Sequence, residues 1–130
     1  MSIIEEIGIL AEETKELCAK AYRELRVLHD EAAKSSHNLL AKRYEMEAQQ
    51  VGAIFIAMTC ILIDAEECNI SRCCPLLLER CKDQAEKDFP VMPEIRESAP
   101  EIILRLEKMI SLSKNLFDLK NGGLREEIIV

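Results

Sequence analysis

The sequence predicts an all-α protein, an antiparallel helical bundle of four main helices with a fully buried central helix. Three observations support this prediction. Apolar residues recur at steps of three and four along most of the chain, which is the spacing of one helix face. Only four Gly and four Pro occur in 130 residues. Residues 51–63 carry no charged side chain although 32% of the chain is charged, which predicts a helix that is buried on every side.

The first helix is predicted to run from about Ser2 to Ala33, because its apolar residues form one wide stripe. A stripe of this width is typical of a bundle helix that contacts two neighbours. The second helix is predicted from about His37 to Cys68, with Ser35 or Ser36 as its N-cap. Since the connection is short, the two helices should run antiparallel. The residues of the stripe are Ile3, Ile4, Ile7, Leu10, Ala11, Leu17, Cys18, Ala21, Leu25 and Leu28.

Two further helices follow from the positions of proline and of capping residues. Pro75 suits the first turn of a third helix that ends near residues 88–90. The letters "SAPE" at 98–101 predict the start of a fourth helix, with Ser98 as N-cap and Glu101 completing a capping box. "NGG" at 121–123 predicts its end, which leaves 124–130 as a flexible tail. Residues 1–130 are expected to form a single all-α bundle domain.

Charge and hydropathy exclude several classes of partner. A net charge of −7 with no basic cluster argues against nucleic acid. The apolar run of thirteen residues is shorter than the roughly 20 needed to cross a bilayer, and the chain is acidic from Glu5 onward, so neither a membrane span nor a signal peptide is expected. The predicted location is cytoplasmic. If one small bundle cannot enclose the apolar run, its surplus surface calls for a homo-oligomer, either a dimer or a tetramer.

Three short stretches carry a resemblance to a known family. "EEIGIL" at 5–10, "QQVGAIFIAM" at 49–58 and "CNIS" at 68–71 resemble motifs of the MazG-type all-α nucleotide pyrophosphohydrolases. In that family a Glu-Glu-x-x-Glu helix packs on a helix that begins Glu-Glu-x-x-Asp. The match touches residues 3–90 in patches. It implies an all-α fold, a nucleotide ligand, and Mg²⁺-dependent conversion of a nucleoside triphosphate to the monophosphate and pyrophosphate.

The family's metal ligands are mostly absent from this chain. Glu6 matches the first ligand, but Ile9, Gln50 and Ala53 stand where the family has carboxylates. Mg²⁺ prefers oxygen ligands, so these residues predict a catalytically eroded protein with no cofactor, a pseudoenzyme that acts through oligomerisation or through binding a partner or nucleotide. The alternative is an active Mg²⁺ enzyme that recruits other acids. The candidates are Glu12, Glu13 and Glu16, although a solvated helix face is the simpler interpretation of the same acids.

The six cysteines give a second alternative, a copper or zinc site made of thiolates. Cys73, Cys74 and Cys81 are the candidate ligands, although the C-x-x-C pairs of structural zinc sites are missing. The other interpretation is that cysteine serves as a small apolar residue. It predicts that Cys18, Cys60 and Cys81 are buried, that Cys73 and Cys74 are exposed in a turn, and that no disulfide forms.

Overall fold

The structure is a computed structural model that describes the backbone of residues 1–129 and the side chains of residues 1–118. Helix dominates it, and residues 1–129 contain no strand, which confirms the all-α prediction. Four α-helices are joined by short connections, one of which includes a single turn of 3₁₀-helix. The elements in chain order are α1 (Ile3–Lys34), α2 (Asn38–Glu66), α3 (Cys74–Asp88), η1 (Phe89–Val91) and α4 (Ala99–Ile129).

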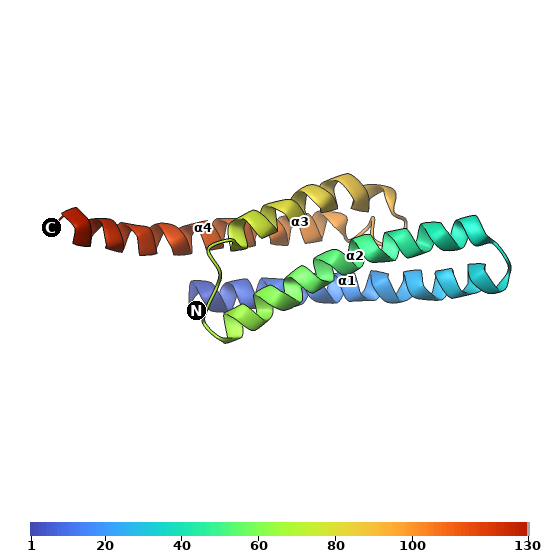
Figure 1. Cartoon of the computed structure of the whole chain (residues 1–130), viewed down its shortest axis with the longest axis horizontal. Helices are drawn as coiled ribbons and strands as arrows, with labels where there is room; N and C mark the ends of the chain where they lie inside the picture. Colours follow the sequence, from blue (N-terminus) through green and yellow to red (C-terminus); the bar gives the residue numbers. More distant parts are fainter. Residues whose placement is uncertain (130) are drawn as a thin grey trace.

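The helices are arranged as two pairs (Figure 1). α1 and α2 lie side by side, run in opposite directions and are joined by a tight turn; α3 and α4 form the second pair. α1 and α2 extend beyond α3 and α4 at one end, and α4 extends beyond them at the other. One cluster of buried apolar residues draws on all four helices and on Phe89, Met92 and Ile95 of the connection to α4.

Local sequence explains where α1 and α3 begin. The Ser2 hydroxyl accepts a hydrogen bond from the Glu5 N–H at 3.1 Å, so α1 has a serine N-cap. Pro75 lies in the first turn of α3, where its missing N–H costs no helix hydrogen bond. Both starts lie within a residue or two of the positions that the sequence predicts.

The turn between α1 and α2 differs from the prediction. Ser36 has a left-handed backbone with φ of 60°, and its N–H donates to the Ala33 carbonyl oxygen at 3.2 Å. The His37 N–H donates to the Ala32 carbonyl oxygen at 2.9 Å, which completes a Schellman motif. Ser35 and Ser36 therefore close α1 and do not cap α2. His37 is the N-cap of α2, and its side chain makes no capping hydrogen bond.

α4 begins at Ala99, directly after Ser98, as the sequence predicts, but the capping box and the C-terminal stop differ from the prediction. A capping box would require the Ser98 N–H to donate to the Glu101 carboxylate. Instead the Ser98 N–H donates to the Ile95 carbonyl oxygen at 3.0 Å. The helix continues through 121–123 to Ile129, so the predicted stop is wrong, and Val130 lies outside the described residues. The flexibility predicted for 124–130 stays a prediction. Glycine inside a helix costs about 1 kcal/mol relative to alanine, which weakens a helix without ending it.

α2 is buried on only part of its circumference. Val51, Ile54, Met58 and Ile61 are at most 2% exposed, whereas Ile56 is 63% exposed. The prediction of a fully buried central helix is thus wrong for the single chain. The reason is that α2 packs mainly on α1 and has a smaller contact with α3, and no other described helix packs extensively on its remaining side.

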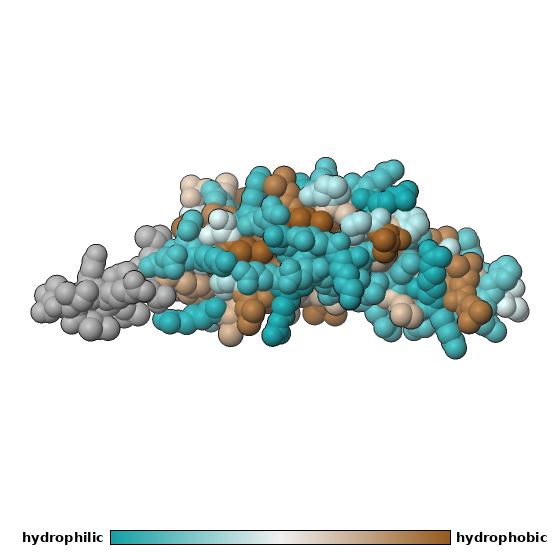
Figure 2. Space-filling view, turned by 90° about the horizontal axis from the view of Figure 1, so that it is seen from above, coloured by the Kyte–Doolittle hydropathy of each residue, from teal (hydrophilic) through white to brown (hydrophobic). Residues whose placement is uncertain are grey.

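The length and apolar composition of α2 also bear on its surroundings. Among the described residues, it is the one helix long and apolar enough to span a membrane by length and composition. Part of this apolar surface is packed in the protein core rather than open. Seen from above, the surface shows separate hydrophobic patches among hydrophilic residues, including toward the end where α1 and α2 extend beyond α3 and α4 (Figure 2).

The left-handed Ser36 generates the first prediction. Replacing it with glycine removes the steric cost of positive φ, so Ser36→Gly should stabilise the fold by about 1 kcal/mol in urea denaturation. Ser35→Gly is the matched control, because Ser35 has an ordinary φ of −87°. It should be neutral or slightly destabilising. Equal effects of the two substitutions would contradict this account of the turn.

Candidate functional site

The acids of α1 that the sequence singles out have separate surroundings. Glu6 is half-buried, and Glu16 is exposed. Glu12 lies 3.5 Å from the Lys15 ammonium nitrogen, as a surface ion pair within α1. Glu13 pairs instead with Arg105 of α4. The structure therefore does not gather these carboxylates into one site.

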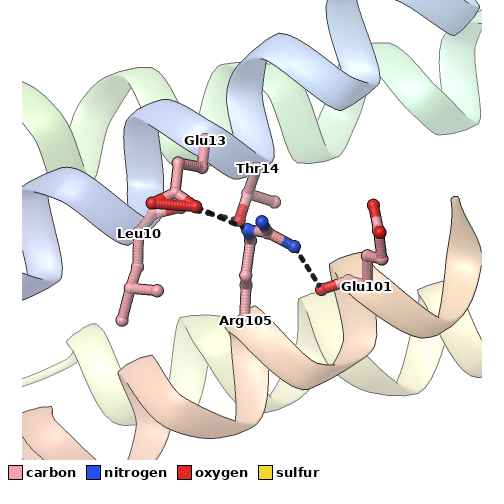
Figure 3. Close-up of polar contacts among 5 residues, drawn as sticks. All are labelled: Leu10, Glu13, Thr14, Glu101 and Arg105. Carbon is pink, nitrogen blue, oxygen red and sulfur yellow. Dashed lines mark hydrogen bonds and ion pairs between the residues drawn. The ribbon is translucent and has the colours of Figure 1, made fainter.

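Glu13 links α1 to α4 (Figure 3). Arg105 donates from Nε to Glu13 Oε2 at 3.0 Å and from a terminal nitrogen to the Glu101 carbonyl oxygen at 3.2 Å. Beside this contact the Thr14 hydroxyl, which is fully buried, donates to the Leu10 carbonyl oxygen at 2.7 Å. The guanidinium and the carboxylate thus satisfy each other in a structural contact, and neither is positioned as a ligand for a metal ion.

The register of α1 against α2 separates the two motifs of the family resemblance. A Cβ placed on Gly8 would lie 3.5 Å from Ala65, and one placed on Gly52 would lie 3.7 Å from the Tyr22 ring. Gln50 is therefore opposite a part of α1 that is about eighteen residues, or roughly 25 Å, beyond Glu6. A metal ion cannot be shared by side chains so far apart.

The motif residues line two different cavities. Glu6 and Ile9 border a pocket of about 450 Å³ that also includes Lys108 and Leu112 of α4. Ala53 lies on a groove between α1 and α2. Gln50 is half-buried, and its carbonyl oxygen accepts from Gln84 Nε2 at 3.2 Å. Across the part of the chain that the structure describes, no three His, Cys, Asp or Glu side chains are close enough to hold a metal ion.

The candidate thiolate ligands are divided between core and surface. Cys74 and Cys81 are buried, as is Cys18 of α1, whereas Cys73 is exposed. Cys60 is also exposed, so the predicted positions of Cys60 and Cys74 are wrong. The cause is helical phase: Cys74 is the first residue of α3 and points to the same side as Cys81, two turns later.

Burial makes these core thiols poor metal ligands. It raises the pKa of Cys18 to about 12, with a smaller contribution from Cys81. It also raises the pKa of Cys81 to about 11. The pKa of Cys74 is raised to about 11, first by burial and then by the charges of Asp64 and Cys81. Because a thiol binds a soft metal as the thiolate, the protonated form favoured here suits apolar packing.

The uncovered side of α2 carries a regular stripe of exposed residues. Its members follow each other at alternating steps of four and three, which is the heptad spacing of a coiled-coil seam. The stripe has an apolar middle and one charged residue at each end. We call it the α2 stripe; its residues are Lys42, Met46, Gln49, Ala53, Ile56, Cys60, Ile63 and Glu67, all exposed.

Next to the stripe lies a groove of about 760 Å³ between α1 and α2, which we call the hairpin groove. α1 contributes two arginines and the Tyr22 ring to it, and α2 contributes a mostly apolar wall. Neither arginine makes a hydrogen bond or ion pair with another described side chain. The lining residues are Ala19, Tyr22, Arg23, Arg26, Glu45, Ala48, Gln49, Gly52, Ala53, Phe55 and Ile56.

A cluster of three charged side chains lies near the start of α2. Arg43 Nε donates to Glu47 Oε1 at 3.0 Å. This hydrogen bond, and then the charge of Glu47, raises the pKa of Arg43, with a further contribution from Glu94 in the connection before α4. Glu47 Oε2 and Glu94 Oε2 are buried without a partner among the described residues. The Arg43 guanidinium already binds one carboxylate of the cluster, and among the described residues no third acid joins the two to form a metal site.

Comparison with known proteins gives no relative: no family model, no curated protein and no solved structure matches the chain. Function is therefore inferred from the two features that the fold leaves open. These are the α2 stripe and the hairpin groove.

The cysteine environments generate the second prediction. At pH 8 a disulfide reagent such as DTNB should react with three thiols of the native protein, Cys60, Cys68 and Cys73, and with all six after denaturation. The buried three remain protonated because their pKa values are raised to 11 or above. Raising the pH to 9 should leave the native count at three. Five or six rapidly reacting thiols would contradict the packing of α3.

Proposed function

We propose that this is a non-catalytic helical-bundle protein that acts by assembly, as a homodimer formed through the α2 stripe. The observation that carries this proposal is the exposed heptad spacing of the stripe, with Ile56 63% and Ile63 48% exposed. Apolar side chains at that spacing gain most when a second helix packs along them. A second copy of the chain is the partner proposed, because the stripe is complementary to itself.

The self-complementarity appears when two stripes are paired antiparallel about a two-fold axis. Centring the pair between Ala53 and Ile56 places Ala53 of one copy against Ile56 of the other. In the same register Gln49 meets Cys60, and Met46 meets Ile63. Small residues therefore face large ones at the centre, which lets the two backbones approach closely.

The charges at the ends of the stripe favour the same register. Lys42 of one copy meets Glu67 of the second copy, and the flanking Arg43, which also donates to Glu47 of its own chain, meets Asp64. The two-fold axis repeats both pairs. On the other flank Glu45, which lines the groove, faces Glu66, and this pair of like charges is unfavourable. A parallel pairing would instead place Lys42 against Lys42, so electrostatics supports the antiparallel dimer.

Dimerisation would complete the architecture predicted from the sequence. The antiparallel bundle would then enclose the apolar helix on all sides, with α1 on one side and the second α2 on the other. The Mg²⁺ pyrophosphohydrolase remains the alternative, and it requires grouped carboxylates, which the described residues do not provide. A thermal-shift titration with Mg²⁺ and a panel of nucleotides separates the two, since stabilisation by a nucleoside triphosphate would favour the enzyme.

Two substitutions that lie two residues apart, on different sides of α2, test the dimer. Ile56→Lys places a charge in the proposed seam and should give a folded monomer, measured by light scattering with circular dichroism as the check on folding. Ile54→Lys should unfold the chain, at a cost above about 4 kcal/mol, because Ile54 is 1% exposed in the core. A monomeric wild-type protein at micromolar concentration would end the proposal.

Cross-linking tests the register of the same dimer. In a background where Cys60, Cys68 and Cys73 are replaced by serine, the double variant Ala53→Cys/Ile56→Cys should form a covalent dimer on mild oxidation. Ala53→Cys alone should cross-link less, because the two copies of position 53 are offset along the antiparallel pair. Equal cross-linking by the single variant would indicate a parallel arrangement.

A further inference from the structure

The hairpin groove is a built cavity whose use the proposed dimer does not explain. We propose that it binds an amphipathic organic anion, with a carboxylate or phosphate head on Arg23 and Arg26 and an apolar body along α2. The groove belongs to a single chain, so this inference goes beyond the dimer and does not rest on it. Its volume of about 760 Å³ lies within the range of small-molecule sites.

The two arginines define the head group. Arg23 and Arg26 are three residues apart on α1 and so lie on one face of the helix, where both border the groove. Neither has an ion pair or hydrogen bond with another described residue, although most of the charges available in this protein of net charge −7 are acidic. Guanidinium groups match the paired oxygens of carboxylates and phosphates. An anionic ligand would supply the partners that these side chains lack.

The negative charge on the groove does not cancel the positive charges of the two arginines. Among the residues that the structure describes, Glu45 is the single acid that lines it, against two arginines. Its carboxylate lies 4.0 Å from His29 Nε2, toward the turn between the helices. The groove thus carries a net positive charge in an acidic molecule. Such a site attracts anions over cations.

The rest of the lining defines the body of the ligand. Ala19, Ala48, Phe55 and Ile56 give apolar walls, and Gly52 leaves the middle of the α2 wall without a side chain. The Lys15 ammonium lies 5.9 Å from the centre of the Phe55 ring and is paired with Glu12. An alkyl chain or a ring is therefore the complementary body. A small polar anion such as inorganic phosphate would leave these walls uncovered.

The experiment uses three ligands with the same twelve-carbon chain, titrated by calorimetry below the micelle concentrations of the two anions and below the solubility limit of the alcohol. Dodecanoate and dodecyl phosphate should bind one per chain, and 1-dodecanol, which lacks the charge, should bind at least about tenfold more weakly. Tighter binding of one of the two anions would identify the preferred head group as carboxylate or phosphate. Equal binding of 1-dodecanol would overturn the proposal, because it would show an apolar patch without anion recognition.

Matched variants locate the site. Arg23→Gln/Arg26→Gln should weaken dodecanoate binding by at least tenfold. Arg72→Gln/Arg80→Gln removes the same charge from exposed positions outside the groove and should leave binding unchanged. Gly52→Leu should block binding while both arginines remain, because it fills the groove beside Tyr22. An equal loss in the two double variants, with native circular dichroism, would overturn the assignment to this groove.

One variant separates this inference from the proposed dimer. Ile63 belongs to the α2 stripe but does not line the groove. Ile63→Lys should therefore give a monomer that still binds dodecanoate. A wild-type monomer that binds would remove the dimer alone, whereas a dimer that fails to bind dodecanoate and dodecyl phosphate would remove the ligand site alone.

Discussion

The packing of α2 on α1 is the contact on which the other features of this protein depend. The two long helices meet in a fixed register, marked by Gly8 beside Ala65 and by Gly52 beside the Tyr22 ring. Burying Ile54, Met58 and Ile61 of α2 in the common core is worth roughly 1.5–3 kcal/mol for each side chain, so a rotation or shift of α2 is costly. Because α2 is apolar around most of its surface, the same contact leaves a second apolar side without a partner. The α2 stripe and the hairpin groove both result from this uncovered apolar side of α2.

Much of the fold could be predicted from the sequence, because long amphipathic helices reveal themselves by periodicity. The boundaries of α1 and the proline in the first turn of α3 are examples. The wrong predictions concern residue patterns that are typical of two different local structures. Serine is common both before a helix and at its C-terminal turn, and only the left-handed φ of Ser36 shows which applies. Glycine in "NGG" is a helix stop in many chains, but here the helix-forming residues around it carry α4 to Ile129.

Less of the candidate site could be predicted, because it depends on relations between helices. The motif comparison treats Glu6 and Gln50 as partners, whereas their separation along the hairpin follows from register, which spacing within one helix does not contain. The pairing of Glu13 with Arg105 joins residues 92 positions apart and has no local signature. Arg23 and Arg26 resemble ordinary surface charges in the sequence. They become notable only when the structure shows that both border the same cavity.

The two open features share side chains, which gives the proposed assembly and the proposed ligand a common energetic basis. Gln49, Ala53 and Ile56 belong to the α2 stripe and also line the hairpin groove. A second copy packed on the stripe would cover the open side of the groove and exclude water from it, and this would strengthen the attraction between the arginines and an anion. By linkage, a ligand held more tightly by the dimer than by the monomer favours the dimer to the same extent. The hydrophobic stripe and the basic groove would then act as one coupled surface, in which occupancy of the groove adds to the strength of an assembly that the stripe provides.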